Sequence, residues 1–273
     1  MLISALNFIG KKTIDATHWL AHEFMGICTH IGEFLFFLAT TLRTFFTTRL
    51  KLNQLLDQLM RVGVDSSSII FLTGFSTGLA LALQTYIGFH RFGIEEFIGT
   101  VVALGMTREL GPVLTGLMVT GRCGSAMAAE LGTMEITEQI DALKTLGINP
   151  FQYLIVPRIL ASVIMLPFLA IFSMAFGTLG GYLLCVYSLE ISPEAYMSSI
   201  KEFVEFSDIN GGLIKSSFFG FILSSISTYN GYVTTGGARG VGITTTRSVV
   251  LGSIMILIAN YFLSSILFQT GIS

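Results

Sequence analysis

Long runs of apolar residues, each about the length that crosses a lipid bilayer, recur along this chain. They cover residues 69–89, 97–120, 159–187, 213–235 and 249–269. A transmembrane helix needs about 20 consecutive, mostly apolar residues. Strongly polar side chains are rare in these runs, and the main exceptions are Arg108 and Glu109 in the second run. The pattern therefore predicts five membrane-spanning helices.

The first 65 residues differ from the rest, because charged residues lie there among apolar residues at helical spacing. The most apolar part, from Phe34 to Leu42, is too short to cross a bilayer. A helix that lies in the membrane interface explains this pattern better than a sixth span does. We therefore expect an N-terminal interfacial amphipathic helix region over residues 1–65 and a five-span domain over residues 66–273. Asp65 then offers an N-cap for the first span.

Two shorter helices are predicted between the spans. Residues 137–146 lie between the second and third spans, where Thr137 can cap a helix and Gly147 can end it. Between the third and fourth spans, Pro193 suits the first turn of an amphipathic helix over about residues 193–206.

The helix predicted at residues 137–146 has one apolar and one polar side. The apolar side consists of Ile140, Leu143 and Leu146, and the polar side consists of Glu138, Gln139, Asp141 and Lys144. A polar helix between membrane spans must face water or a protein partner. Two interpretations remain open: a solvated loop helix, or a docking helix that inserts into a groove on a cytoplasmic motor protein.

The distribution of Lys and Arg predicts the orientation of the chain, because the cytoplasmic flanks of membrane spans carry more of these residues than the outer flanks. With the N-terminus inside, the cytoplasmic flanks hold Arg49, Lys51, Arg61, Arg122, Lys144, Arg158, Arg239 and Arg247, and the outer flanks hold Arg91, Lys201 and Lys215. The N-terminus is therefore expected in the cytoplasm and the C-terminus on the outer side.

The composition agrees with an all-α integral membrane protein and excludes several other classes. Of the 273 residues, 52% are hydrophobic and only 12% are charged, whereas soluble domains are about 25% charged. The cysteines, Cys28, Cys123 and Cys185, are too widely spaced to indicate a disulfide framework or a metal site. The sequence has no basic stripe for nucleic acid and no phosphate-binding loop motif, so another subunit must bind any ATP.

Arg108 and Glu109 fall near the middle of the second run, where charge is costly and usually faces a bundle interior or a wet cavity. Neighbouring residues of a helix point in different directions, so the two need not pair with each other. Gly105, Gly111 and Pro112 lie beside them and predict a bent or partly unwound helix. We interpret the pair either as part of structural ion pairs between helices or as a site for a polar or anionic headgroup.

Two motifs of small residues predict close contacts between helices. Gly74 and Gly78 lie four residues apart in the first span, and Gly177 and Gly181 lie four residues apart in the third. Small side chains at this spacing allow two helix backbones to approach closely. Contact within one subunit and contact across a dimer both fit the motif.

In one long block the sequence resembles a known family. Residues 107–143 read TRELGPVLTGLMVTGRCGSAMAAELGTMEITEQIDAL, and residues 147–158 read GINPFQYLIVPR. The segments LIKSSFFG at 213–220 and GVGITTTRSVV at 240–250 are similar to the same family. Together these segments resemble MlaE-type permeases of ABC lipid transporters. The resemblance extends over nearly the whole chain and is weakest in its first part.

This resemblance implies a homodimeric permease of the inner membrane, with its N-terminus cytoplasmic and its C-terminus periplasmic. It implies a cytoplasmic ABC ATPase that binds ATP and Mg, a periplasmic MCE-domain protein, and phospholipid as cargo. The chain itself is then not an enzyme and binds no cofactor. The helix at 137–146 is the coupling helix, and its ATPase-coupling residues are Thr137, Glu138, Gln139, Asp141, Ala142 and Lys144. The residues that match polar positions of the lipid cavity or its support are Arg108, Glu109 and Arg247.

Two other functions remain open on the residues alone. An ATP-independent secondary transporter would use Arg108 and Glu109 as an ion-coupled site for an amphipathic or anionic substrate. A structural scaffold for MCE proteins would carry out no transport. A bound ATPase discriminates against the first, and ATP-coupled lipid transfer discriminates against the second.

Overall fold

A computed structural model describes residues 28–48 and 51–270, and the chain divides into two units, Met1–Thr47 and Thr48–Ser273. In the first unit, residues 28–47 form a helix. Much of the predicted interfacial helix falls in residues 1–27, which lie outside the described residues. The interfacial position of the N-terminal region therefore stays a prediction.

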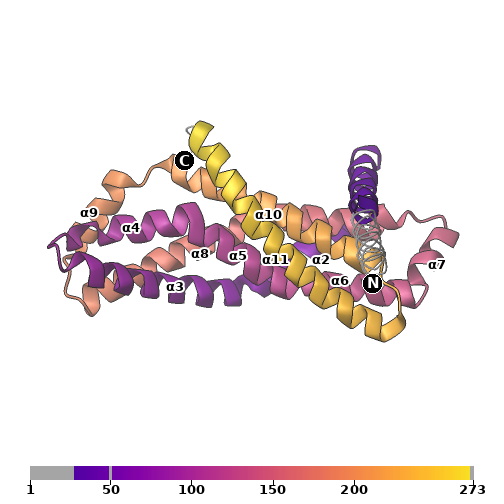
Figure 1. The fold of residues 1–273 in the computed structure, drawn as a ribbon, viewed down its shortest axis with the longest axis horizontal. Helices are drawn as coiled ribbons and strands as arrows, with labels where there is room; N and C mark the ends of the chain where they lie inside the picture. Colours follow the sequence, from indigo (N-terminus) through magenta and orange to yellow (C-terminus); the bar gives the residue numbers. More distant parts are fainter. Residues whose placement is uncertain (1–27, 49–50, 271–273) are drawn as a thin grey trace, which may run out of the picture. The chain divides into compact units, whose positions relative to one another are not determined.

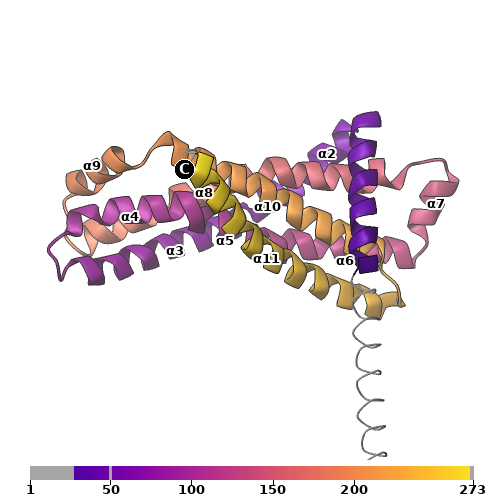
Figure 2. The same cartoon turned by 45° about the horizontal axis from the view of Figure 1, so that its top comes forward.

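The regular elements described in the second unit are all helices, and five helical segments are long and apolar enough to cross a membrane (Figures 1 and 2). These segments are Leu52–Phe89, Glu95–Ile136, Phe151–Tyr187, Phe206–Tyr232 and Gly237–Leu267. They confirm the predicted all-α membrane protein with five spans. The two short helices, α7 (Gln139–Thr145) and α9 (Pro193–Phe203), lie at opposite ends of the bundle.

Three of the five spans are divided into several helical elements. The first span runs through α2 (Leu52–Leu59), η1 (Met60–Val64) and α3 (Asp65–Phe89). The second runs through η2 (Glu95–Phe97), α4 (Ile98–Gly105), η3 (Met106–Leu110), α5 (Gly111–Val119), η4 (Thr120–Gly124) and α6 (Ser125–Ile136). The third consists of η5 (Phe151–Ile155) and α8 (Val156–Tyr187). The fourth and fifth spans are the single helices α10 (Phe206–Tyr232) and α11 (Gly237–Thr270).

The spans begin earlier than the apolar runs predicted. A run of apolar residues marks only the part of a helix that lies in hydrocarbon, whereas the backbone hydrogen bonds continue past it. The first span begins at Leu52 instead of residue 69, so the predicted boundary after residue 65 falls inside one continuous helical segment. The chain divides after Thr47 instead. Asp65 follows helical residues and therefore does not cap the start of this span.

Four short π-helical turns, η1, η3, η4 and η5, interrupt the first three spans in the described part of the chain. In a π turn a backbone N–H bonds to the carbonyl five residues before it, as the Gly111 N–H does to Met106 O in η3. Pro112 contributes to this irregularity, because it has no N–H for the carbonyl of Arg108. The predicted irregularity beside Gly111 and Pro112 is thus a π turn, and it carries Arg108 and Glu109.

Small residues bring α3 and α8 into close contact. Gly78 of α3 lies so close to the backbone of Gly177 in α8 that no side chain fits at position 78. Gly74 faces Ser173 one turn away, where an added Cβ atom would lie 3.0 Å from the Ser173 backbone. The two predicted small-residue motifs therefore meet each other within one subunit.

The apolar core lies between the second span and α8, α10 and α11. Its fully buried side chains include Val119, Leu166, Phe219, Leu223 and Ile256. The last span, α11, is the least buried of the five, so one long side of it stays uncovered in the single chain.

The helix predicted near residues 193–206 is confirmed as α9, with Pro193 in its first turn, although it ends at Phe203. Tyr196 of α9 is fully buried and packs in one cluster with Ile98 and Val102 of α4. Thr100 of α4 donates a hydrogen bond of 2.9 Å to a backbone carbonyl of α9. These contacts fix α9 across one end of the second span.

Candidate functional site

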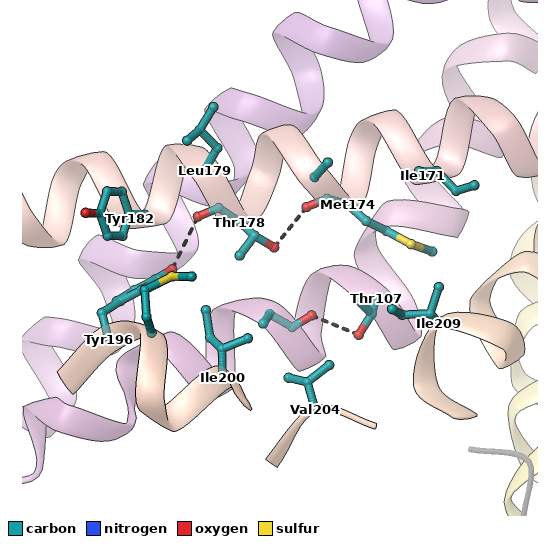
Figure 3. A pocket seen from close by; sticks show the side chains of 13 residues that line it. Thr107, Ile171, Met174, Thr178, Leu179, Tyr182, Tyr196, Ile200, Val204 and Ile209 are labelled. Atoms are coloured by element: carbon teal, nitrogen blue, oxygen red, sulfur yellow. Dashed lines mark hydrogen bonds between the residues drawn. The ribbon is translucent and has the colours of Figure 1, made fainter. Parts of the chain in front are cut away.

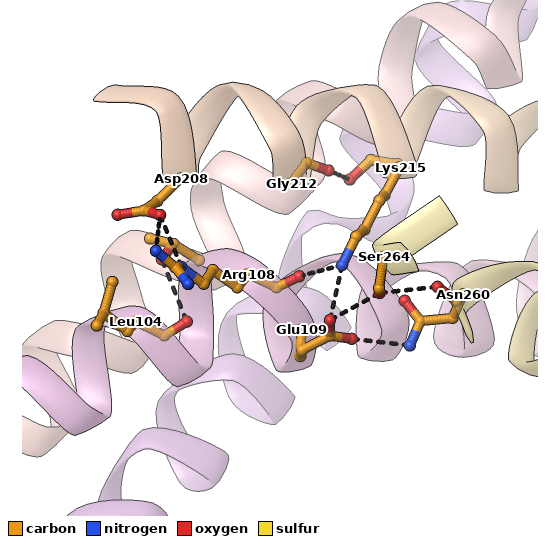
Figure 4. Close-up of polar contacts among 10 residues, drawn as sticks. Leu104, Arg108, Glu109, Asp208, Gly212, Lys215, Asn260 and Ser264 are labelled. Carbon is orange, nitrogen blue, oxygen red and sulfur yellow. Dashed lines mark hydrogen bonds and ion pairs between the residues drawn. The ribbon is translucent and has the colours of Figure 1, made fainter. Parts of the chain in front are cut away.

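Arg108 forms an ion pair with Asp208 at the start of α10 (Figure 4). The distance from Arg108 Nη2 to Asp208 Oδ1 is 2.6 Å, and Asp208 is fully buried while the Arg108 side chain is 43% exposed. The other carboxylate oxygen of Asp208 accepts the backbone N–H of Glu205, which completes a capping box at the start of α10. Arg108 therefore holds the beginning of α10 against the second span.

Glu109 bonds to three polar side chains of α10 and α11 (Figure 4). Lys215 Nζ lies 2.7 Å from Glu109 Oε1, and Asn260 Nδ2 lies 2.8 Å from Oε2. Ser264 Oγ donates a third bond of 2.8 Å to Oε1. The Lys215 side chain is only 4% exposed, and a buried ammonium group is tolerated only beside an anion. Glu109 supplies that anion and thereby joins three spans at one carboxylate.

Lys215 also satisfies the interrupted backbone of the second span. Its Nζ donates a second hydrogen bond, 2.7 Å long, to the backbone carbonyl of Arg108. In a regular α-helix this carbonyl would accept the N–H of residue 112, but Pro112 has none. The π turn and the polar network therefore depend on each other.

The arrangement bears on both interpretations of Arg108 and Glu109. As expected, they do not pair with each other, because each pairs with a residue of α10. This is the geometry of structural ion pairs between helices. Both side chains still keep part of their surface exposed, 43% for Arg108 and 44% for Glu109. Each therefore remains accessible to a ligand.

Sequence reasoning missed the two partners, because Lys215 was counted only as a charge on the outer flank and Asp208 was not singled out. Both are buried in α10, with Asp208 fully buried and the Lys215 side chain 4% exposed. A signal was present in their spacing. Residues seven apart lie on one side of a helix, two turns from each other, so this acid and this base face the same neighbour.

Arg247, the third predicted cavity residue, lies far from the other two within one chain. It is exposed on α11, and none of the ion pairs within residues 28–48 and 51–270 includes it. Asn260, which contacts Glu109, follows it on the same helix by thirteen residues, or about 20 Å of helix length. A single subunit therefore does not bring Arg247 to the network.

A second charged cluster, which sequence reasoning did not identify, joins the first three spans nearer to α7. Arg158 is 4% exposed and lies 2.8 Å from Glu130 Oε2. Arg61 lies 3.4 Å from the other carboxylate oxygen of Glu130, and Arg122 donates a 3.1 Å hydrogen bond to the Arg61 carbonyl in η1. In the sequence analysis these arginines served only to predict the orientation of the chain in the membrane. Their contacts also tie the spans together.

The helix predicted at residues 137–146 is present as α7, but its first residues differ from the prediction. Thr137 does not cap it, because its hydroxyl donates back to a carbonyl of α6 at 2.7 Å. Glu138 takes the N-cap position with a φ of 59°, in the left-handed region that costs most residues about 1–2 kcal/mol. Gly147 ends the helix as predicted, with a φ of 73°. The 2.9 Å bond from Ile148 N–H to Leu143 O belongs to a Schellman motif.

Most side chains of α7 and its flanks are exposed. Ile140 is fully buried and anchors the helix, whereas Leu146, expected on the same apolar side, is 74% exposed. The predicted coupling residues are all exposed: Thr137, Glu138, Gln139, Asp141, Ala142 and Lys144. The predicted apolar side is therefore only partly used within the chain.

Two contacts of Lys144 link α7 to its surroundings. Its Nζ lies 2.8 Å from Asp141 Oδ1, and this hydrogen bond raises the pKa of Lys144, so the ammonium group stays charged at neutral pH. The same Nζ lies over the ring of Tyr232, 5.8 Å from its centroid, at the end of α10. α7 thus touches the span whose other end holds Asp208 and Lys215.

Comparisons with known proteins agree on one family. The family described as permease MlaE matches residues 55–266. A probable ABC transporter permease protein of Rickettsia typhi is 42% identical over 269 residues, which cover 98% of this chain and 100% of that protein. The intermembrane phospholipid transport system permease protein MlaE of Haemophilus influenzae is 35% identical over 273 residues, with 99% and 100% covered. The chloroplastic protein TRIGALACTOSYLDIACYLGLYCEROL 1 of Arabidopsis thaliana is 44% identical over 214 residues, with 78% and 61% covered.

Proposed function

The chain belongs to the MlaE family of ABC transporter permeases, and on that premise we propose that it is the membrane subunit of an ATP-driven phospholipid transporter. Permease subunits of ABC transporters are not enzymes, and a separate subunit hydrolyses ATP. The complete transporter is then a homodimer of this chain in the inner membrane. It works with a cytoplasmic ATPase that binds ATP and Mg and with a periplasmic MCE-domain protein, and its N-terminus is cytoplasmic and its C-terminus periplasmic.

The observation that carries this proposal is α7, a short helix between two spans that offers nearly all its side chains to a partner. Ile140 anchors it, and its ends are defined by Glu138 and by Gly147. A solvated loop needs neither defined ends nor an exposed leucine, whereas Leu146 is 74% exposed beside charged residues. A short amphipathic helix with an apolar edge suits insertion into a groove of another protein.

α10 supports a connection from this docking helix to the polar network. One end of α10 contacts α7 through Tyr232, and the other end holds Arg108 through Asp208 and Glu109 through Lys215. Packed helices shift as units between discrete arrangements. Movement of α7 during the ATPase cycle would therefore shift α10 and, with it, Arg108 and Glu109.

The uncovered side of α11 supports the proposed homodimer. Its exposed apolar residues include Val250, Ile254, Leu257, Ile258, Tyr261 and Phe262. Arg247 is exposed on the same helix, and a charge that faces lipid without a partner is costly. When this side of α11 faces a second copy across a partly water-filled space, Arg247 is hydrated and this cost is removed. We propose that the lipid cavity lies between the two copies, with Arg108 and Glu109 as the charged groups near the headgroup and Arg247 lining the cavity further along α11.

Copurification tests the docking helix. Glu138→Lys together with Asp141→Lys reverses two charges of α7, and we expect the ATPase to be lost from the complex in mild detergent. The matched control is Glu194→Lys with Glu202→Lys, which makes the same change on exposed positions of α9 at the opposite end, and which should retain the ATPase. An ATPase that stays bound to the α7 variant, or a wild-type chain that binds none, contradicts the proposal.

Reconstituted vesicles test the transport itself. We expect ATP to drive phospholipid transfer by the wild-type complex, and Arg108→Ala and Glu109→Ala to reduce it in complexes that still assemble. Normal transfer by both variants would rule out the proposed charged site. A scaffold would give no transfer at all. The ATP-independent alternative predicts transfer without the ATPase, and Glu109 already has three bonding partners that an ion-coupled site would have to release.

A further inference from the structure

A cavity of about 600 Å³ lies beside the polar network, at the α9 end of the bundle (Figure 3). α4 and η3 form one wall through Ala103 and Thr107, α8 forms another from Ile171 to Tyr182, and α9 covers it with Tyr196 and Ile200. Val204 and Ile209 close the side towards α10. This volume is within the roughly 300–1,000 Å³ of most ligand pockets.

The cavity offers almost no free polar group. Three of its four hydroxyls already donate to backbone carbonyls: Thr107 to Ala103 at 2.9 Å, Thr178 to Met174 at 2.9 Å, and Tyr196 to Thr178 at 3.3 Å. Burial also raises the pKa of the Tyr196 phenol, which stays neutral. None of the unpartnered buried polar atoms among the described residues belongs to the lining. The cavity therefore suits an alkyl chain and no polar molecule.

The mouth of the cavity lies where its lining residues are exposed, at Ile171 and Leu179 of α8 and Met197 of α9. Its inner wall is buried, with Met174 5% and Tyr196 1% exposed, whereas Leu179 at the mouth is 44% exposed. The exposed side of α8 continues with apolar residues such as Phe168 and Phe172. A span with such a side is surrounded by lipid tails, so a lipid tail is the molecule that meets this opening.

The cavity is separate from the proposed cavity between two copies. No residue of α11 lines it, and neither does Arg108, Glu109 or Arg247. It nevertheless ends beside the polar network, because Thr107 and Ile209 in its lining are the direct neighbours of Arg108 and Asp208. An occupant would touch the helix turn that carries Arg108.

We propose that this cavity binds one acyl chain of a bilayer phospholipid, which enters sideways from the leaflet at the α9 end. The inference rests on the proposed function in taking lipid as the cargo, and it adds a lateral loading site on each subunit. α9 is polar on its other side, where Glu194, Lys201 and Glu202 are exposed. The headgroup can therefore stay at the membrane surface while the tail lies beneath α9.

Photolabelling of the assembled complex in lipid nanodiscs tests the proposal. The probe is phosphatidylglycerol with a diazirine near the end of one acyl chain, and mass spectrometry locates the labelled residues. Met174 and Tyr196 are almost completely buried and are reached only by a chain inside the cavity, whereas Phe172 is 49% exposed and is labelled from the bilayer in any case. We expect label on all three residues.

Two variants fill the cavity from different sides, Ala175→Phe from α8 and Ile200→Phe from α9. Each should reduce label on Met174 and Tyr196 by roughly fivefold or more, because a close-packed site has no room for both ring and lipid chain. Label on Phe172 should stay unchanged, and a melting temperature of the complex close to that of the wild type shows that the variant is folded. Ile164→Phe adds the same ring to an exposed position of α8 outside the cavity and should change neither label.

Label on Phe172 without label on Met174 and Tyr196 in the wild-type complex overturns the proposal, and so does cavity label that survives in both folded filling variants. The labelling needs neither ATP nor turnover. A complex that takes up label but fails to move lipid with ATP would therefore contradict the proposed function and leave this site intact.

Discussion

The polar network around Arg108 and the surface of α7 both carry charges of both signs, but they use them in opposite ways. In the network, Asp208 and Lys215 are withdrawn from water and bond to side chains of another span. On α7, the one ion pair joins Asp141 to Lys144 within the same helix, and both are well exposed. Buried charge holds helices in position, whereas exposed charge adds little stability and is available to a partner. Substitutions should therefore have large effects on stability in the network and small ones on α7.

Asp208→Ala should have the largest effect. It leaves Arg108 without its anion and also removes the capping box of α10. Breaking a fully buried ion pair costs about 3–5 kcal/mol, and we expect somewhat less, about 2–3 kcal/mol, because Arg108 is 43% exposed. The melting temperature of the purified complex measures it. Glu205→Ala weakens only the cap and should cost about 1 kcal/mol, and an equal loss in both variants would contradict the importance of the ion pair.

Lys215→Met should follow, with a loss of about 2 kcal/mol, because it leaves Glu109 and the Arg108 carbonyl without their cation. Adding Glu109→Gln to this variant should restore part of the stability, since a neutral amide no longer needs that cation. The comparison uses melting temperatures of the two single variants and the double variant. Strictly additive losses would mean that the two residues do not act as a pair.

Gly147→Ala tests the end of α7. The φ of 73° at this residue should cost an alanine about 1 kcal/mol in local stability. We expect faster hydrogen exchange in α7 and weaker ATPase binding, with little change in the melting temperature of the spans. Gly88→Ala, at a helical position with open space around it, is the control and should leave exchange in α7 unchanged. Unchanged exchange in the Gly147 variant would contradict the Schellman motif.

Asp141→Asn should have the smallest effect on stability. The exposed pair with Lys144 contributes roughly 0–1 kcal/mol, so the melting temperature should stay close to that of the wild type. Under the proposed function the same change weakens binding of the ATPase, which titration of the purified subunits measures. A large drop in melting temperature would remove the contrast between α7 and the network.

Much of the fold could be predicted from local patterns. The five spans follow from apolar runs of sufficient length, and the end of α7 follows from Gly147. The contact of α3 with α8 follows from Gly78 and Gly177, although the motif left open which helices meet. The helix starts were wrong where polar residues continue a helix beyond the membrane, as they do from Leu52 onwards.

The sequence by itself determined that the chain spans a membrane, that Arg108 and Glu109 interrupt a span beside a proline, and that a polar helix lies between two spans. Hydrophobicity, helical periodicity and proline chemistry act over a few residues, so they can be recognised without a fold. Only the tertiary structure decided that the two charges are paired by Asp208 and Lys215, and that Glu130 gathers two arginines from other spans. The physical reason is that a charge in an apolar medium is stabilised by whichever opposite charge the packing brings within about 3 Å. In this chain those partners lie as far as 106 residues away along the sequence.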